Sequence, residues 1–206
     1  MRIRDSILLI CALAWSDPAS AKVYQLTVSI HEAVSMTQND VKDILKRASN
    51  LLHQKPNSCD IEFKLKGITH FASPPPADII DEMSLEQVQN VPGDVKVVRS
   101  IKFCVGKNWE NGVFGCSWRP DDHLPRTVIV TPPPHDGSYD DEVLWAHEFG
   151  HTRGLPHRTD DPDALMQACI SPDHTQVNKS ECRHFLAGPP NHYPPPSSQC
   201  SALSGD

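Results

Sequence analysis

Residues 147–157, with the sequence HEFGHTRGLPH, constrain the local fold more than any other stretch of this chain. Each residue of a helix advances by about 100°, so His147 and His151 would lie on one face, one turn apart. Gly154 can adopt the left-handed conformation that ends a helix, and Pro156 prevents the helix from resuming. The spacing therefore predicts a helix that ends near this glycine, followed by a turn that brings His157 back toward the first two histidines.

Three histidines arranged in this way can bind one metal ion. Three neutral imidazoles with one position left for water are typical of catalytic zinc sites, whereas a structural site would be closed by a fourth protein ligand. Imidazole ligands also suit copper, nickel or cobalt, but zinc is the usual occupant of such a helix. We therefore predict that His147, His151 and His157 bind one catalytic Zn²⁺. Glu148, on the flank of the same face, is predicted to be the general base.

The same residues carry a resemblance to a known family. The run from the first to the third histidine resembles the zinc-binding signature of the metzincin metalloproteases. Met166, nine residues after His157, ends a segment that resembles the methionine turn beneath the zinc in that family. The likeness is closest to a minimal matrixin-like catalytic domain, although Arg158 stands where matrixins usually have serine. The resemblance implies a zincin fold, with a twisted mixed sheet, an N-terminal helix, an active-site helix and a small irregular C-terminal subdomain that holds the methionine turn and a C-terminal helix.

The resemblance and the ligand chemistry imply the same function, a zinc-dependent endopeptidase that hydrolyses peptide bonds in proteins outside the cytoplasm. Zinc would activate a water molecule, and Glu148 would take its proton and later give it to the leaving amine. One alternative is a metzincin-shaped binding protein or toxin component whose zinc site is not catalytic. Another is the hydrolysis of a small peptide or of a non-peptide amide.

In metzincins the substrate lies extended along an edge strand of the sheet. The resemblance implies that residues 112–116 form the corresponding strand here. An edge strand supplies backbone hydrogen bonds and little sequence selectivity. The alternative for this segment is a hairpin closed by a disulfide, without a role in binding. The proposed substrate-binding residues are Gly112, Val113, Phe114, Gly115 and Cys116.

The N-terminus has the layout of a cleavable secretory signal. Two arginines precede an apolar stretch at residues 7–15, and small residues stand before a cleavage site that follows Ala21. We expect residues 1–21 to be the signal peptide, residues 22–188 to form the catalytic domain, and residues 189–206 to be a proline-rich tail. The mature protein would then be secreted or periplasmic.

Seven cysteines are present, and one lies within the expected signal. The remaining even number is typical of three disulfides in an oxidising compartment, and fifteen connectivities are possible for six cysteines. Proximity in the sequence favours two of the pairs, and the third would tie the tail to the domain. The predicted pairs are Cys104–Cys116, Cys169–Cys182 and Cys59–Cys200.

Length and charge restrict the class of protein. The chain has 206 residues and a formal net charge of -7, which allows one domain of ordinary size. The acidic balance argues against nucleic-acid binding, because that function requires a cationic face. Apolar runs stay below the roughly 18 residues of a membrane span. We expect a monomer that acts on a protein or peptide substrate, without a nucleic-acid partner or a membrane span.

Hydrophobic patterning predicts strands and helices in mixed order, which favours an α/β (α+β) fold built mostly on one sheet. Strands are expected at residues 22–30, 61–68, 94–105, 111–119 and 127–130, and helices at 39–52, at 84–91 and from 140 onward.

Overall fold

The computed structural model describes most of the expected catalytic domain. Residues 1–20 of the predicted signal peptide, the proline-rich tail and Cys200 lie outside the described residues, as do residues 118 and 119 of one predicted strand. The described residues are 21–54, 59–104, 106–117, 127–132 and 140–187.

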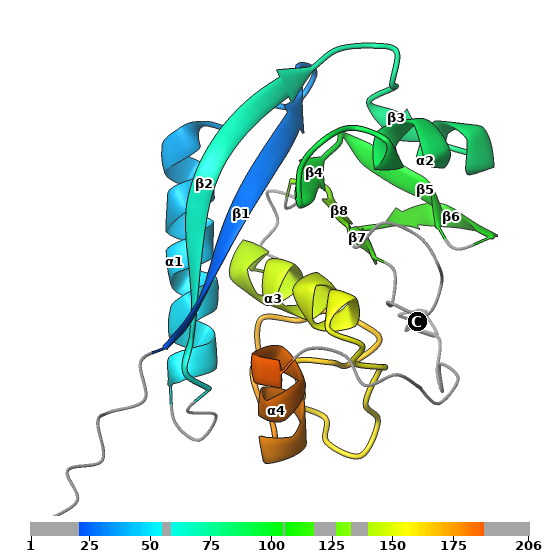
Figure 1. Ribbon diagram of the computed structural model, residues 1–206. Coiled ribbons are helices and arrows are strands. Elements are labelled where there is room, and N and C mark those ends of the chain that lie inside the picture. The colour runs from blue at the N-terminus through cyan, green and yellow to red at the C-terminus, as the bar shows by residue number, and fades with distance from the viewer. Residues whose placement is uncertain (1–20, 55–58, 105, 118–126, 133–139, 188–206) are drawn as a thin grey trace, which may run out of the picture.

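A five-stranded mixed sheet organises the fold (Figure 1). Its strands are β1 (Lys22–His31), β2 (Ile61–Phe71), β4 (Val95–Val97), β7 (Gly115–Ser117) and β8 (Val128–Val130). They lie in the order β2-β1-β4-β8-β7. The first four strands of this order are parallel, whereas β7 pairs antiparallel with β8. Among the described strands, β7 is therefore the last of the sheet on this side.

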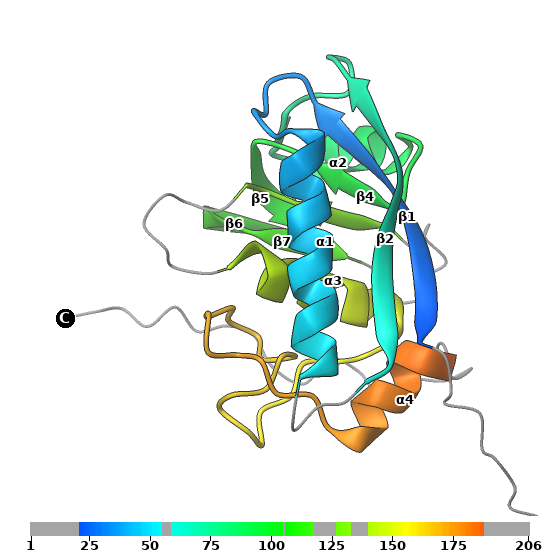
Figure 2. The ribbon, with the colours of Figure 1, turned by 90° about the vertical axis from the view of Figure 1, so that its left-hand side faces the viewer.

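Helix α1 (Gln38–His53) connects β1 to β2, which allows these two strands to run parallel. It begins with a capping box, in which Thr37 and Asp40 each bind the other's backbone amide. Its apolar residues recur at helical spacing and are buried against the sheet. Figure 2 shows α1 lying along β1 and β2.

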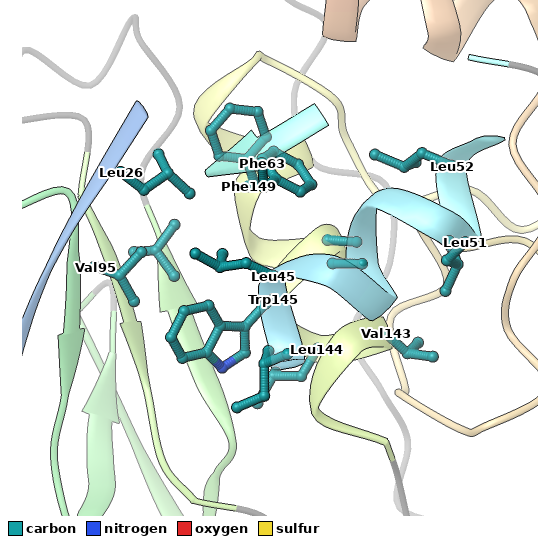
Figure 3. Packing of buried hydrophobic residues seen from close by; sticks show 14 of the residues in the cluster. Leu26, Leu45, Leu51, Leu52, Phe63, Val95, Val143, Leu144, Trp145 and Phe149 are labelled. Carbon is teal, nitrogen blue, oxygen red and sulfur yellow. The ribbon is translucent and has the colours of Figure 1, made fainter. Parts of the chain in front are cut away.

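Helix α3 (Asp141–Thr152) packs against α1, and α4 (Lys179–Ala187) lies beneath α3 in Figure 1. Both helices contribute to the larger of two apolar cores. Figure 3 shows Leu45 of α1 and Trp145 of α3 among the residues of this core. Burial stabilises a fold by about 25 cal/mol per Å² of apolar surface, so these contacts hold α3 against α1 and the sheet.

A second sheet and a smaller core lie on the other side of β4 and β8. The sheet contains β3 (Asp78–Ile79), β5 (Ser100–Cys104) and β6 (Lys107–Val113), and helix α2 (Glu82–Gln89) packs beside it. Strand β8 shows how the two cores share the main sheet, because Val128 and Val130 belong to the larger core and Ile129 to the smaller.

The single strand predicted at residues 94–105 is wrong. The chain leaves the main sheet after β4 and enters the second sheet at β5. The transfer is visible in the backbone hydrogen bonds, since the amide of Val98 donates to Val130 whereas the amide of Arg99 donates to Ala77. Val97 and Val98 are both buried, in different cores. Apolar residues lie on both sides of this change of sheet, so the sequence pattern did not reveal it.

The strand predicted at residues 111–119 is likewise divided. Gly112 and Val113 end β6 in the second sheet, whereas Gly115 and Cys116 lie in β7 of the main sheet. Gly112 has φ +75°, a left-handed conformation that disfavours residues with a side chain. Only part of the predicted substrate-binding segment therefore lies on the edge of the main sheet.

One predicted disulfide is confirmed and two are wrong. Cys104 and Cys116 are bonded, with Cα atoms 6.0 Å apart, and join β5 to β7. Cys182 is bonded to Cys59, with Cα atoms 5.4 Å apart, rather than to Cys169. Cys59 is therefore not bonded to Cys200, and Cys169 is itself disulfide-bonded.

The long-range disulfide follows from the position of α4. The hydroxyl of Tyr24 and the ammonium of Lys22, both on β1, donate to the backbone carbonyls of Phe185 and Leu186 on α4. The start of β2 pairs with this end of β1, so Cys59 is brought to α4. Proximity along the chain could not reveal this contact.

The predicted α/β (α+β) class and zincin-like arrangement are confirmed, with a mixed sheet, an N-terminal helix, a helix bearing the histidines and a C-terminal helix. Within the described part of the chain, no helix combines the length and apolarity needed to cross a bilayer.

Candidate active site

The predicted helix ending is present at the C-terminus of α3. The amide of Gly154 donates to the carbonyl of His151 at 2.8 Å, and the amide of Leu155 donates to that of Gly150 at 3.0 Å. These two bonds define a Schellman motif, and Gly154 has the required positive φ of +87°. Leu155 is buried and fixes the exit of the chain. The turn directs the following residues back toward α3.

The turn brings the three predicted ligands together. The Nε2 atom of His151 lies 3.1 Å from that of His147 and 3.2 Å from that of His157. Zinc–nitrogen bonds of 2.0–2.1 Å in a tetrahedron place neighbouring nitrogens about 3.3 Å apart. Both distances from His151 therefore match a single zinc ion, and the ligand atoms of all three histidines lie within 4.8 Å of one another.

Two carbonyl groups set the tautomers of the first two histidines. The Nδ1 atom of His147 lies 2.7 Å from the carbonyl oxygen of Leu165, and that of His151 lies 2.7 Å from the carbonyl oxygen of Leu155. A carbonyl oxygen only accepts, so each Nδ1 carries the proton and each Nε2 presents a lone pair. Lone pairs facing each other at this distance repel unless a cation lies between them. The donor set thus fits zinc.

His147 is also kept neutral by its surroundings. Burial lowers the pKa of its imidazole to about 3, and the neighbouring His157 adds to that effect. Only the neutral form of imidazole can bind a metal.

Met166 supports the helix that carries two of the histidines. Its segment is held by backbone hydrogen bonds between Leu165 and Gln176 and between Met166 and Arg158, each 2.8 Å long. The Met166 side chain is completely buried, and a Cβ atom at Gly150 of α3 would lie 2.6 Å from its sulfur. The absence of a side chain at Gly150 therefore lets this segment pack directly against α3. The carbonyl that orients His147 comes from the same segment.

Glu148 points from α3 toward β7. Its side chain is buried, and burial raises the pKa of the carboxyl to about 7, while a hydrogen bond from Ser117 lowers it. The Ser117 hydroxyl lies 2.5 Å from Oε2 of Glu148. A Cβ atom at Gly115 would lie only 2.2 Å from Oε1 of Glu148. The sequence did not identify Ser117. Gly115, the glycine at the start of this short strand, was the one sign in the sequence that another group approaches the backbone closely here.

Arg158, beside the third histidine, forms a partly buried ionic cluster that sequence reasoning also missed. Its guanidinium lies 2.7 Å from Oε2 of Glu181 on α4 and 2.5 Å from Oδ2 of Asp161. Glu181 also accepts a hydrogen bond from the amide of Asn178 at 2.7 Å. The cluster ties the segment after His157 to α4.

The structure thus brings together the three histidines, Glu148 and the segment of Met166. Of the predicted substrate-binding residues, Gly115 and Cys116 lie next to α3 in β7, and Phe114 immediately precedes that strand with its side chain 42% exposed. Gly112 and Val113 belong to the neighbouring sheet.

The chain matches solved structures, but it matches no protein-family model and no curated protein sequence. Among solved structures, it resembles metalloproteinase-II from Bacteroides fragilis with a TM-score of 0.54 and 20% identity over 82% of this chain. The match covers 55% of that protein, so the chain spans about half of its length. The likeness does not single out the matrixin branch. It shows that this chain has the fold of a metalloprotease.

Proposed function

We propose that the protein is an exported zinc-dependent endopeptidase of the metzincin type. The observation that carries the proposal is the convergence of three imidazoles at the end of the helix that bears the buried Glu148. The Nε2 atom of His151 lies 3.1 Å from that of His147 and 3.2 Å from that of His157. The fold of a metalloprotease supports the same conclusion.

Each side chain has a distinct role in this proposal. His147, His151 and His157 hold the metal ion, and the carbonyls of Leu155 and Leu165 keep the first two imidazoles in the binding tautomer. When bound, zinc supplies Lewis acidity that polarises the scissile carbonyl and acidifies a water molecule.

Glu148 transfers the proton. Its carboxylate accepts a proton from the attacking water and returns it to the amine that leaves. The side chain is 5% exposed, so bulk water does not compete for the carboxylate. The adjacent strand β7 limits its movement.

Strand β7 is the proposed substrate-binding edge. It is the last strand of the main sheet in the described part of the chain and pairs on one side with β8. An extended peptide could add to its other side through backbone hydrogen bonds. Phe114, Gly115 and Cys116 are retained as proposed substrate-binding residues, whereas Gly112 and Val113 lie in β6.

Export is supported by disulfides in the described residues, because they persist in oxidising compartments. The cleavable signal, secretion and a monomeric state remain parts of the proposal.

The proposal is tested by incubating the purified protein with a mixed peptide library and mapping the products by mass spectrometry. We expect internal cleavage that a chelator abolishes and that added zinc restores. A zinc-loaded protein that leaves all peptides intact would refute peptidase activity and favour the non-catalytic binding protein. Cleavage of small amides alone would indicate a different hydrolase.

A further inference from the structure

Two residues of β7 approach Glu148 from the same side. Gly115 and Ser117 are two positions apart on the strand, so they lie on the same face of the sheet. Cys116 lies between them on the opposite face and is bonded to Cys104 in the second core. Strand β7 is therefore fixed by a disulfide on one face while its other face contacts α3.

The two oxygens of Glu148 have different surroundings. Oε2 accepts the hydrogen bond from the Ser117 hydroxyl at 2.5 Å. Oε1 lies against the backbone at Gly115, where a Cβ atom would come within 2.2 Å of it and within 2.5 Å of the carboxyl carbon. This carboxylate position is possible only with a glycine at 115. One oxygen of the carboxylate thus accepts a hydrogen bond, and the other occupies the space left by the missing side chain of Gly115.

The attachment of β7 makes this arrangement rigid. Its three residues pair with Val128, Ile129 and Val130 of β8, in the interior of the main sheet. A glutamate side chain has several rotatable bonds, and its freedom opposes any single orientation. A hydrogen bond from a fixed strand overcomes that freedom and keeps the carboxylate in one place before substrate arrives.

We propose that Ser117 is a positioning residue for the general base, with Gly115 providing the space that the carboxylate occupies. The inference rests on the proposed peptidase function. The Ser117 hydroxyl holds Oε2 and thereby fixes the orientation of the carboxylate that accepts the proton from water. Ser117 itself exchanges no proton with the substrate.

The test compares zinc-loaded wild type with Ser117→Ala, Ser117→Thr and Gly115→Ala, using a peptide that the wild type cleaves. Losing a hydrogen bond to a charged group changes an equilibrium or a rate by about 10- to 100-fold. We expect Ser117→Ala to lower kcat by about 10- to 100-fold with KM and zinc affinity within about twofold of wild type. Ser117→Thr retains the hydroxyl and should keep kcat within about threefold.

The matched control is Ser100→Ala, because the Ser100 hydroxyl also donates to a carboxylate, Oδ1 of Asp78 at 2.7 Å, in the second sheet. This control should leave kcat unchanged. Gly115→Ala should lower kcat by displacing Glu148 while zinc still binds. Equal kcat values for wild type and Ser117→Ala would overturn the proposal, and so would a parallel loss of zinc affinity in Ser117→Ala.

A structural readout separates this proposal from the proposed function. Crystal structures of zinc-loaded wild type and Ser117→Ala should show one orientation of the Glu148 carboxylate in the first and a displaced or multiple orientation in the second. An identical carboxylate in both would overturn the positioning role even if the wild type cleaved no peptide. An inactive wild type with the expected difference between the two structures would refute the peptidase function alone.

Discussion

Replacing Gly154 by alanine tests whether the turn after α3 assembles the metal site. The residue has φ +87°, and its amide forms one of the two bonds that end the helix. An L-residue with a Cβ atom in the left-handed conformation costs about 1–2 kcal/mol. We therefore expect Gly154→Ala to lower the free energy of unfolding of the zinc-saturated protein by about 1–2 kcal/mol.

The same strain should weaken zinc binding if the metal-free turn relaxes. Because 1–2 kcal/mol corresponds to a factor of about 5–30 in an equilibrium constant, the zinc dissociation constant should rise by up to that factor. Urea unfolding at fixed free zinc and competition with a chromogenic chelator measure the two effects. Asparagine adopts the left-handed conformation more readily than alanine, so Gly154→Asn should lie between wild type and Gly154→Ala.

A suitable control is Gly67→Ala in β2, where no positive φ is present and a Cβ atom would meet nothing within 4 Å. It should leave stability unchanged or raise it slightly. If Gly154→Ala matched this control in both stability and zinc affinity, the turn would not be the element that positions His157.

Three further variants test other parts of the fold. Burial lowers the pKa of Lys96 to about 8, so the charged side chain destabilises the fold below pH 8 and that penalty disappears between pH 8 and pH 10.5. In the wild type, the free energy of unfolding should rise by about 3 kcal/mol over this window, and Lys96→Met should abolish that rise. Urea denaturation at pH 7.5 and pH 10.5 measures the difference. Replacing Cys59 and Cys182 by alanine opens a loop with a sequence separation of 123 and should cost about 5 kcal/mol of stability, which an unchanged urea midpoint would contradict. Arg158→Leu leaves Glu181 buried without its cation and should cost about 3–5 kcal/mol, seen as a lower melting temperature that Arg158→Lys partly restores; an unaltered melting temperature would argue against the ionic cluster.

Local features of the fold could be predicted from the sequence because they depend on neighbouring residues. Helical periodicity located α1, and the spacing of the histidines with Gly154 located the end of α3 and the return of His157. These signals arise from rotation per residue and from backbone conformation. Both are fixed within a few residues of the chain.

Features that depend on distant segments could not be predicted in this way. Apolar residues on both sides of Val98 hid the transfer between sheets, because both cores bury valine. The bond between Cys59 and Cys182 depends on the packing of α4 against β1. The hydrogen bond from Ser117 to a glutamate 31 residues away likewise depends on which strand lies beside α3.

The role of Glu148 is tested by comparing zinc content and peptide hydrolysis in wild type, Glu148→Ala and Glu142→Ala. Glu142 lies on the same helix and forms an ion pair with Arg47 at 3.0 Å, so it controls for the loss of a glutamate from α3. We expect one zinc ion in all three proteins and hydrolysis that falls by about 10²- to 10⁴-fold in Glu148→Ala alone. Hydrolysis by zinc-loaded Glu148→Ala at the wild-type rate would contradict the general-base mechanism.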